Sequence, residues 1–254
     1  MPRLVLASAL IIVAALLATP ARSQDEARPP VGGITSPQGA MIFYVAHGQD
    51  GACGPSCSDW IAAEGVVEWD TFKRLFAFIE RLGSASKLPV VLNVWGKGNL
   101  NAATTLGKII REHGLNVSAG TTLVAACANA TEAACFALKR SGQPLDAKID
   151  RSSVLCDVVC VLILAGGVHR TLPPGATLVI GPTHIQNRLA PNLSEERRQG
   201  LQARFDDQFR LYLTKMGVRT DIIDMIDQNS QTGRTTRLTR DTWLQLGLVT
   251  EVAP

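Results

Sequence analysis

The chain of 254 residues lacks a concentration of charge of either sign. Its 25 lysines and arginines and its 22 aspartates and glutamates leave a formal net charge of only +3, and opposite charges lie side by side at 195–198. No basic stripe of the kind that binds nucleic acid is present. Beyond the N-terminus, no apolar run reaches the roughly 20 residues that a membrane-spanning helix needs. The composition, 46% hydrophobic and 19% charged, is that of a globular protein.

The first 23 residues have the pattern of a secretory signal peptide. Arg3 supplies a positive charge, residues 4–18 are almost wholly apolar, and residues 19–23 break the helix and supply small residues at the cleavage positions. The pattern predicts an exported protein, periplasmic or secreted. An uncleaved anchor is the alternative, and the chain would then contact a membrane through this segment alone. Residues 24–39 are rich in proline, glycine and charge, and we expect them to form a mobile leader.

The six cysteines fall into three pairs that are close in sequence. An even number of cysteines in an exported protein favours disulfides, although six can be joined in many ways and the pairing stays open here. Cysteine pairs without neighbouring histidines are poor zinc signatures, so we expect no metal site. The disulfide candidates are Cys53, Cys57, Cys127, Cys135, Cys156 and Cys160.

Apolar periodicity predicts strands that alternate with helices. Strands are expected at 41–46, 60–67, 88–94, 121–126, 147–149 (an edge strand), 176–180 and 248–249. Helices are expected at 68–82, 100–113, 133–139, 154–164, 194–216, 220–226 and from 239 to a stop at Gly247. This alternation predicts an α/β fold with at least partly parallel strand pairing. We expect a single domain over 40–254, with a helical C-terminal part at 194–254.

Four segments stand in an order that is typical of one superfamily. A strand, glycine-rich turn and helix (88–117) precede a cysteine-flanked helix (156–176), a strand ending in histidine (177–184), and a closing segment (239–252). In these segments the chain resembles the secreted branch of the ClpP/crotonase superfamily, which contains serine peptidases. The resemblance covers roughly 40–250. It implies a ClpP/crotonase-like fold of repeated ββα units, with partly parallel sheets flanked by helices, and assembly into homo-oligomers.

Serine is missing where the family carries its nucleophile. The family has Cys-x-Ser-Ala-Cys at the start of the buried helix, and the matching run here is Cys156-Asp157-Val158-Val159-Cys160. Val158 therefore occupies the serine position, and a valine side chain cannot attack a carbonyl carbon. Asp157 is a candidate carboxylate nucleophile or base, with a helix cap as the alternative.

Two serines precede this run and are candidate substitute nucleophiles. Ser152 and Ser153 lie shortly upstream of the expected helix, and capping residues are the alternative interpretation. The resemblance places the catalytic base at His184, one residue later than in the family. Such a shift turns a strand side chain to the other face, unless a bulge at Pro182 absorbs it.

The resemblance also implies an oxyanion hole at the turn after the strand at 88–94. Backbone N–H groups of this turn would stabilise the charge of a tetrahedral intermediate. Here Gly96 and Gly98 are separated by Lys97, and a strand-to-helix turn that needs glycine conformations is the alternative. A carboxylate that orients the histidine would come from the C-terminal region, where Asp221, Asp224 and Asp227 are candidates.

Three functions compete. The first is an exported pseudoenzyme, a serine peptidase homologue without hydrolytic activity that serves as a scaffold or binds a peptide or protein. The second is an active serine peptidase that uses Ser152 or Ser153 with His184 and the Gly96/Gly98 turn. The third, an acyl-CoA enzyme, is disfavoured because an exported protein meets no coenzyme A. The sequence favours the first, with no cofactor.

Overall fold

The computed structural model describes residues 39–83, 87–184 and 194–252; the predicted signal peptide and nearly all of the predicted leader lie outside them. The strands are β1 (Ile42–His47), β2 (Asp59–Gly65), β3 (Val90–Val94), β4 (Val117–Ala119), β5 (Thr121–Val124), β6 (Leu145–Asp150), β7 (Leu155–Cys156), β8 (Arg170–Leu172), β9 (Thr177–Ile180), β10 (Thr236–Leu238) and β11 (Glu251–Val252). The helices are α1 (Thr71–Leu82), α2 (Leu100–Glu112), a 3₁₀ turn η1 (Ala125–Cys127), α3 (Glu132–Lys139), α4 (Val158–Leu164), α5 (Glu195–Lys215), α6 (Asp221–Thr232) and α7 (Arg240–Gln245).

Two sheets organise the described residues. The larger has the strand order β11-β8-β4-β3-β2-β1-β6-β5, and the smaller has the order β10-β9-β7. Five of the seven pairings in the larger sheet are parallel. Two strands followed by a helix recur along the chain, as in β1-β2-α1 and β6-β7-α4. The predicted α/β class and its repeated ββα units are confirmed.

The sequence prediction for β6 was wrong in position. An edge strand was expected at 147–149, but β6 lies between β1 and β5. It pairs in parallel with β1 (Ala46 with Leu145) and antiparallel with β5 (Thr122 with Ile149). Only the first of its six residues is buried, and such a polar sequence resembles that of an edge strand. β5 forms this end of the sheet.

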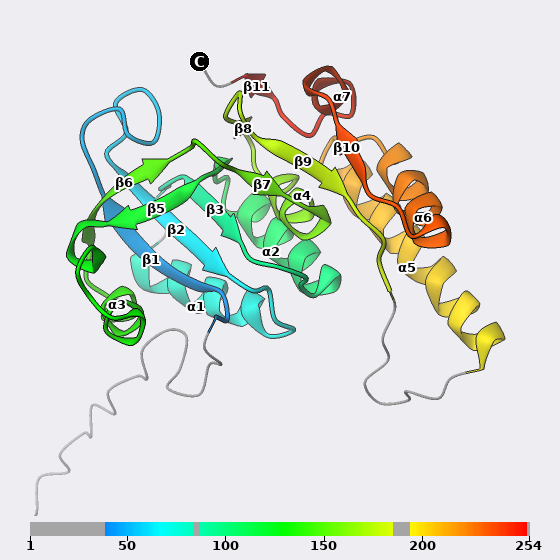
Figure 1. The fold of residues 1–254 in the computed structure, drawn as a ribbon, viewed down its shortest axis with the longest axis horizontal. Helices are drawn as coiled ribbons and strands as arrows, with labels where there is room; N and C mark the ends of the chain where they lie inside the picture. Colours follow the sequence, from blue (N-terminus) through cyan, green and yellow to red (C-terminus); the bar gives the residue numbers. More distant parts are fainter. Residues whose placement is uncertain (1–38, 84–86, 185–193, 253–254) are drawn as a thin grey trace, which may run out of the picture.

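Alternate residues of β1 and β2 face two separate hydrophobic clusters, as the period of two in a strand requires. Met41, Phe43 and Ile61 belong to the main core with α1, α2 and α4. Tyr44 and Trp60 face the opposite side, where η1 and α3 pack. Figure 1 shows α3 at one end of the molecule, with α5 and α6 at the other.

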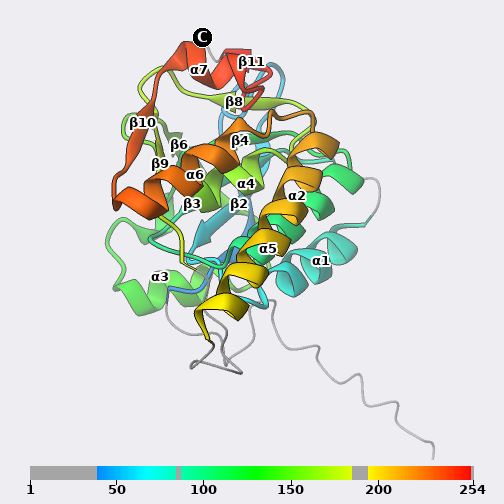
Figure 2. The same cartoon turned by 90° about the vertical axis from the view of Figure 1, so that its right-hand side faces the viewer.

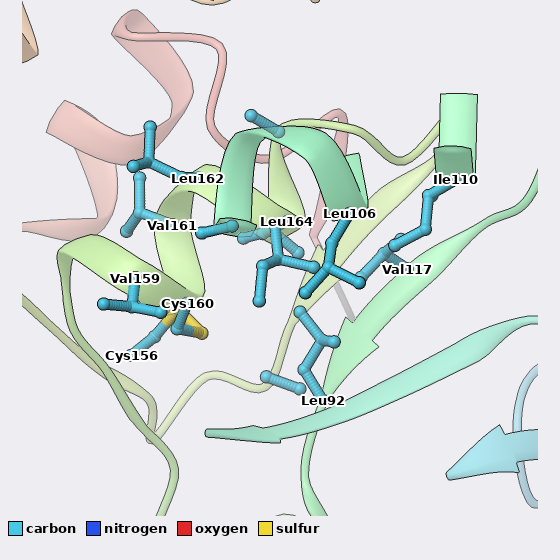
Figure 3. Packing of buried hydrophobic residues seen from close by; sticks show 14 of the residues in the cluster. Leu92, Leu106, Ile110, Val117, Cys156, Val159, Cys160, Val161, Leu162 and Leu164 are labelled. Atoms are coloured by element: carbon cyan, nitrogen blue, oxygen red, sulfur yellow. A yellow bond between two sulfur atoms is a disulfide. The ribbon is translucent and has the colours of Figure 1, made fainter. Parts of the chain in front are cut away.

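Helix α4 forms the centre of the main core. All seven of its residues are buried, as its all-apolar sequence predicts. Figure 3 shows Leu164 of this helix close to Leu106 of α2, and Leu162 belongs to the same core. The helix is shorter than predicted, because residues 155–156 form strand β7 and Asp157 caps the helix.

Helices α2, α4 and α5 approach one another at two glycines. A Cβ atom placed on Gly166, just beyond α4, would lie 2.2 Å from the carbonyl oxygen and 2.4 Å from the Cα of Gly107 in α2. The Tyr212 hydroxyl of α5 donates to the Leu162 carbonyl oxygen (2.6 Å) beside them. Figure 2 shows α5 crossing α2 at this side of the molecule. The absence of side chains at the two glycines permits this packing.

The buried guanidinium of Arg170 joins the C-terminal ends of three helices. It donates to the carbonyl oxygens of Met216 after α5 (3.1 Å) and Gly247 after α7 (2.8 Å). It also donates to Ala165 and Gly167 after α4. Helix C-termini carry partial negative charge, which a cation stabilises. Burial, and then the charge of Arg111, lower the pKa of Arg170.

The C-terminal part departs from the sequence predictions in three places. Strand β11 occupies residues 251–252 rather than 248–249. Leu248 and Val249 are apolar because they lie in a loop and are buried in the core. Helix α6 continues to Thr232, beyond the predicted end at 226. Strand β10 was not predicted, and neither was β8 before this part, because three-residue strands give too short a pattern. Among the described residues, no helix is both long and apolar enough to cross a membrane.

Candidate functional site

The turn after β3 contacts the first turn of α4. Gly96 has a φ of +57°, a conformation that glycine adopts without strain. A Cβ atom placed on Gly98 would lie 3.0 Å from the Cβ of Val67 and 3.2 Å from Val159 Cγ1. Asn99 then caps α2 by accepting from the Ala102 N–H (2.9 Å). The turn therefore packs against the start of α4, and both glycines have structural reasons to be there.

Asp157 is the N-cap of α4. Its Oδ1 accepts from the backbone N–H of Cys160 at 3.1 Å, one of the groups that a helix start leaves unpaired. Burial raises the pKa of Asp157, and the N–H donors of the first turn oppose this. The disulfide between Cys156 and Cys160, with 5.1 Å between the Cα atoms, closes the same turn. Both features hold Val158 in place as the first residue of the helix.

A pocket brings Val158 and His184 together. Its volume is about 30 Å³, room for about two water molecules. Val158 is buried in one wall, and the exposed His184 lies at the rim. Strand β9 ends at Ile180, so residues 181–184 have no alternating faces, and the expected register shift does not apply to His184. Thr183 also lines the pocket, its N–H donating to Ser230 Oγ (3.0 Å).

The two candidate serines lie elsewhere. Ser152 and Ser153 are exposed in the connection between β6 and β7. Neither belongs to the described residues that line the pocket. The Ser152 N–H donates to Asp150 Oδ1 (2.9 Å), and neither serine caps α4, because Asp157 does so. The interpretation of the serines as helix caps was wrong.

The carboxylate in the pocket is Asp206, which the sequence did not single out. Of the three predicted aspartates, Asp221 pairs with Arg219 (3.0 Å) and Asp224 with Arg210 (2.6 Å), both near the surface. Asp227 lies beside the pocket, where Gln202 contacts it. Asp206 directly follows Phe205 in α5. Phe205 was expected to face inward, and this apolar neighbour is the sequence signal that could have drawn attention to Asp206.

The pairing of the cysteines follows their order in the sequence: Cys53 with Cys57, Cys127 with Cys135, and Cys156 with Cys160. Three disulfides indicate an oxidising compartment. Within the described residues, no group of three or more histidine, cysteine or carboxylate side chains could hold a metal ion.

No family model matches the chain, and no curated protein matches it. Several solved structures are similar. A ClpP1 mutant from Listeria monocytogenes has 13% identity over 74% of this chain and 88% of its own, with a TM-score of 0.43. A peptidase from Plasmodium falciparum has 9% identity over 74% and 93%, with a TM-score of 0.41. A third structure, described as an enzyme, has 10% identity over 74% and 93%, with a TM-score of 0.43. At these values no residue's role is carried over to this chain.

Proposed function

We propose that the protein is an exported, ClpP-like pseudoenzyme that binds a peptide segment at the pocket beside α4 without hydrolysing it. One observation carries this proposal: Val158 lies in the same pocket as His184. In a serine hydrolase the base must reach the hydroxyl that it activates. An aliphatic side chain at this place gives the histidine no hydroxyl to deprotonate.

The binding part of the proposal is supported by the shape of this region. Leu100, Leu162 and Ile223 give the pocket apolar walls, and a few polar groups also line it, as in many ligand sites. Strand β7, which leads directly into α4, is one of the two edge strands of the smaller sheet among the described residues. Its Leu155 is 62% exposed. An extended peptide can pair with such an edge and place a side chain in a neighbouring pocket.

The localisation and assembly parts of the proposal have separate support. The signal-peptide pattern of the first 23 residues and the three disulfides both favour export to the periplasm or beyond. The resemblance to ring- and trimer-forming proteins leads us to expect self-association. Sedimentation of the purified protein measures this directly, and a mass equal to one chain at all concentrations would contradict it.

A fluorophosphonate probe tests the absence of hydrolysis, because it reacts with activated serine hydroxyls. We expect no covalent labelling of the purified protein, with an active serine peptidase labelled in parallel to verify the probe. Mass spectrometry of the intact protein measures the adduct.

Labelling that disappears in Ser152→Ala or Ser153→Ala would overturn the pseudoenzyme proposal in favour of an active peptidase. Thr183→Ala serves as a further variant, because Thr183 carries a hydroxyl at the wall of the pocket. Loss of labelling in this variant would equally show an active nucleophile.

A further inference from the structure

One side of the pocket is acidic. The Asp206 carboxylate of α5 lines it and accepts from Gln202 Nε2 at 2.8 Å. The same nitrogen lies 3.5 Å from Asp227 Oδ1 of α6. Two half-buried carboxylates thus share one amide group. Burial, and then the charge of Asp227, raise the pKa of Asp206, while burial is the largest cause of the raised pKa of Asp227.

Among the described residues, a nearby cation pairs with a third carboxylate. Arg210 lies one turn after Asp206 on α5, and its Nη2 donates to Asp224 Oδ1 at 2.6 Å. It also donates to the Thr220 carbonyl oxygen. Its charge acts on Asp206 only as a smaller contribution that lowers the pKa. Its charge is the second-largest cause for Asp227, whose pKa it lowers. Asp206, which lines the pocket, is therefore the less compensated of the two, and a cationic ligand would gain from approaching it.

Two aromatic rings lie next to this carboxylate. Phe205 and Phe209 both line the pocket, stacked with 6.3 Å between their ring centroids. The face of an aromatic ring attracts a cation. The remaining walls, such as Leu162 and Ile226, are aliphatic. Apolar walls, aromatic rings and a carboxylate together match a ligand with an aliphatic stem and a positive tip.

We propose that this pocket binds the ε-ammonium tip of a lysine side chain in the bound peptide. The inference rests on the peptide-binding function proposed above and names the group that is recognised. A volume of about 30 Å³ accepts an ammonium group of about the size of a water molecule, with a methylene beside it. The larger planar guanidinium of arginine fits less well. A peptide's N-terminal amine has a polar backbone behind it, which the aliphatic walls do not match.

The test compares two peptides that differ in one group, acetyl-Ala-Ala-Lys-Ala-Ala-amide and its norleucine counterpart. Norleucine keeps the aliphatic stem and lacks the ammonium. Titrations followed by NMR chemical shifts of the protein should show about tenfold tighter binding of the lysine peptide. The NMR signals of Gln202 and Leu162 should change their chemical shifts when the lysine peptide binds. Equal binding of the two peptides, or no binding of the lysine peptide up to millimolar concentration, overturns the proposal.

The variant Asp206→Asn keeps the shape of the side chain and removes its charge. We expect the preference for lysine over norleucine to fall to about one, while the norleucine peptide binds as before. The matched control is Asp207→Asn, at the next, exposed position of α5, which should keep the preference. An unchanged preference in Asp206→Asn overturns the assignment. Failure here leaves the pseudoenzyme proposal standing, since probe labelling tests for an activated hydroxyl independently of lysine binding.

Discussion

Replacing Arg170 with methionine is expected to lower the free energy of unfolding by about 3 kcal/mol. The methionine fills much of the same space but leaves the carbonyl oxygens of Gly167 and Gly247 without their charged donor. Each buried acceptor without a partner costs about 1–3 kcal/mol. Arg111 still reaches Ala165 and Met216, which limits the loss. Urea denaturation followed by circular dichroism measures the change.

The matched control is Arg219→Met. Arg219 is exposed and pairs with Asp221 at the surface, where solvent screens the pair, so its removal should leave the free energy of unfolding nearly unchanged. If Arg170→Met lowered the free energy of unfolding no more than Arg219→Met does, the three helix ends would not depend on the buried guanidinium. Because whole domains are stable by only about 5–15 kcal/mol, the expected loss is large enough to measure without ambiguity.

Replacing Gly166 with alanine is expected to cost about 3 kcal/mol or more. The new methyl group would lie 2.2–2.6 Å from backbone atoms of Gly107, and no side-chain rotation can relieve a contact with backbone. Helix α2 would have to move away from α4. This movement would also disturb the packing around the hydrogen bond between Tyr212 and Leu162. Thermal or urea unfolding of the variant measures the loss.

Gly175→Ala is the control for this substitution. Gly175 also lies in a turn with an ordinary φ, and the nearest atom to a Cβ there is 3.8 Å away. We expect a change within about 0.5 kcal/mol. A Gly166→Ala protein as stable as the control would mean that α2 and α4 can separate freely, contrary to the packing described above.

Much of the fold could be predicted from periodicity, because long elements repeat their pattern several times. Helices α1, α2 and α5 begin and end within a few residues of their predicted bounds. The strand β7 was absorbed into the helix prediction, because residues 154–164 are apolar almost throughout, and only the cap at Asp157 separates the two elements. The position of β6 depends on distant partners, which a local pattern does not contain.

The candidate site was predictable in part. Val158 and His184 both follow from the order of motifs, and the structure places them in one pocket. Asp206 was missed because α5 is rich in polar residues with few buried positions, and a carboxylate in such a helix resembles a surface group. The packing of α5 and α6 against α4 determines which aspartate enters the pocket. That packing depends on contacts between elements far apart in the sequence, whereas Asp221 and Asp224 were chosen only by their region.

The local pairing of the cysteines has a consequence for the order of events during folding. Partners are separated by only four, eight and four residues. Closing a short loop costs less entropy than closing a long one, so each cysteine meets its proper partner more often than any other. The correct bridges can therefore form in an oxidising environment before the sheets assemble. A chain built in this way has little need of an isomerase to correct its bonds.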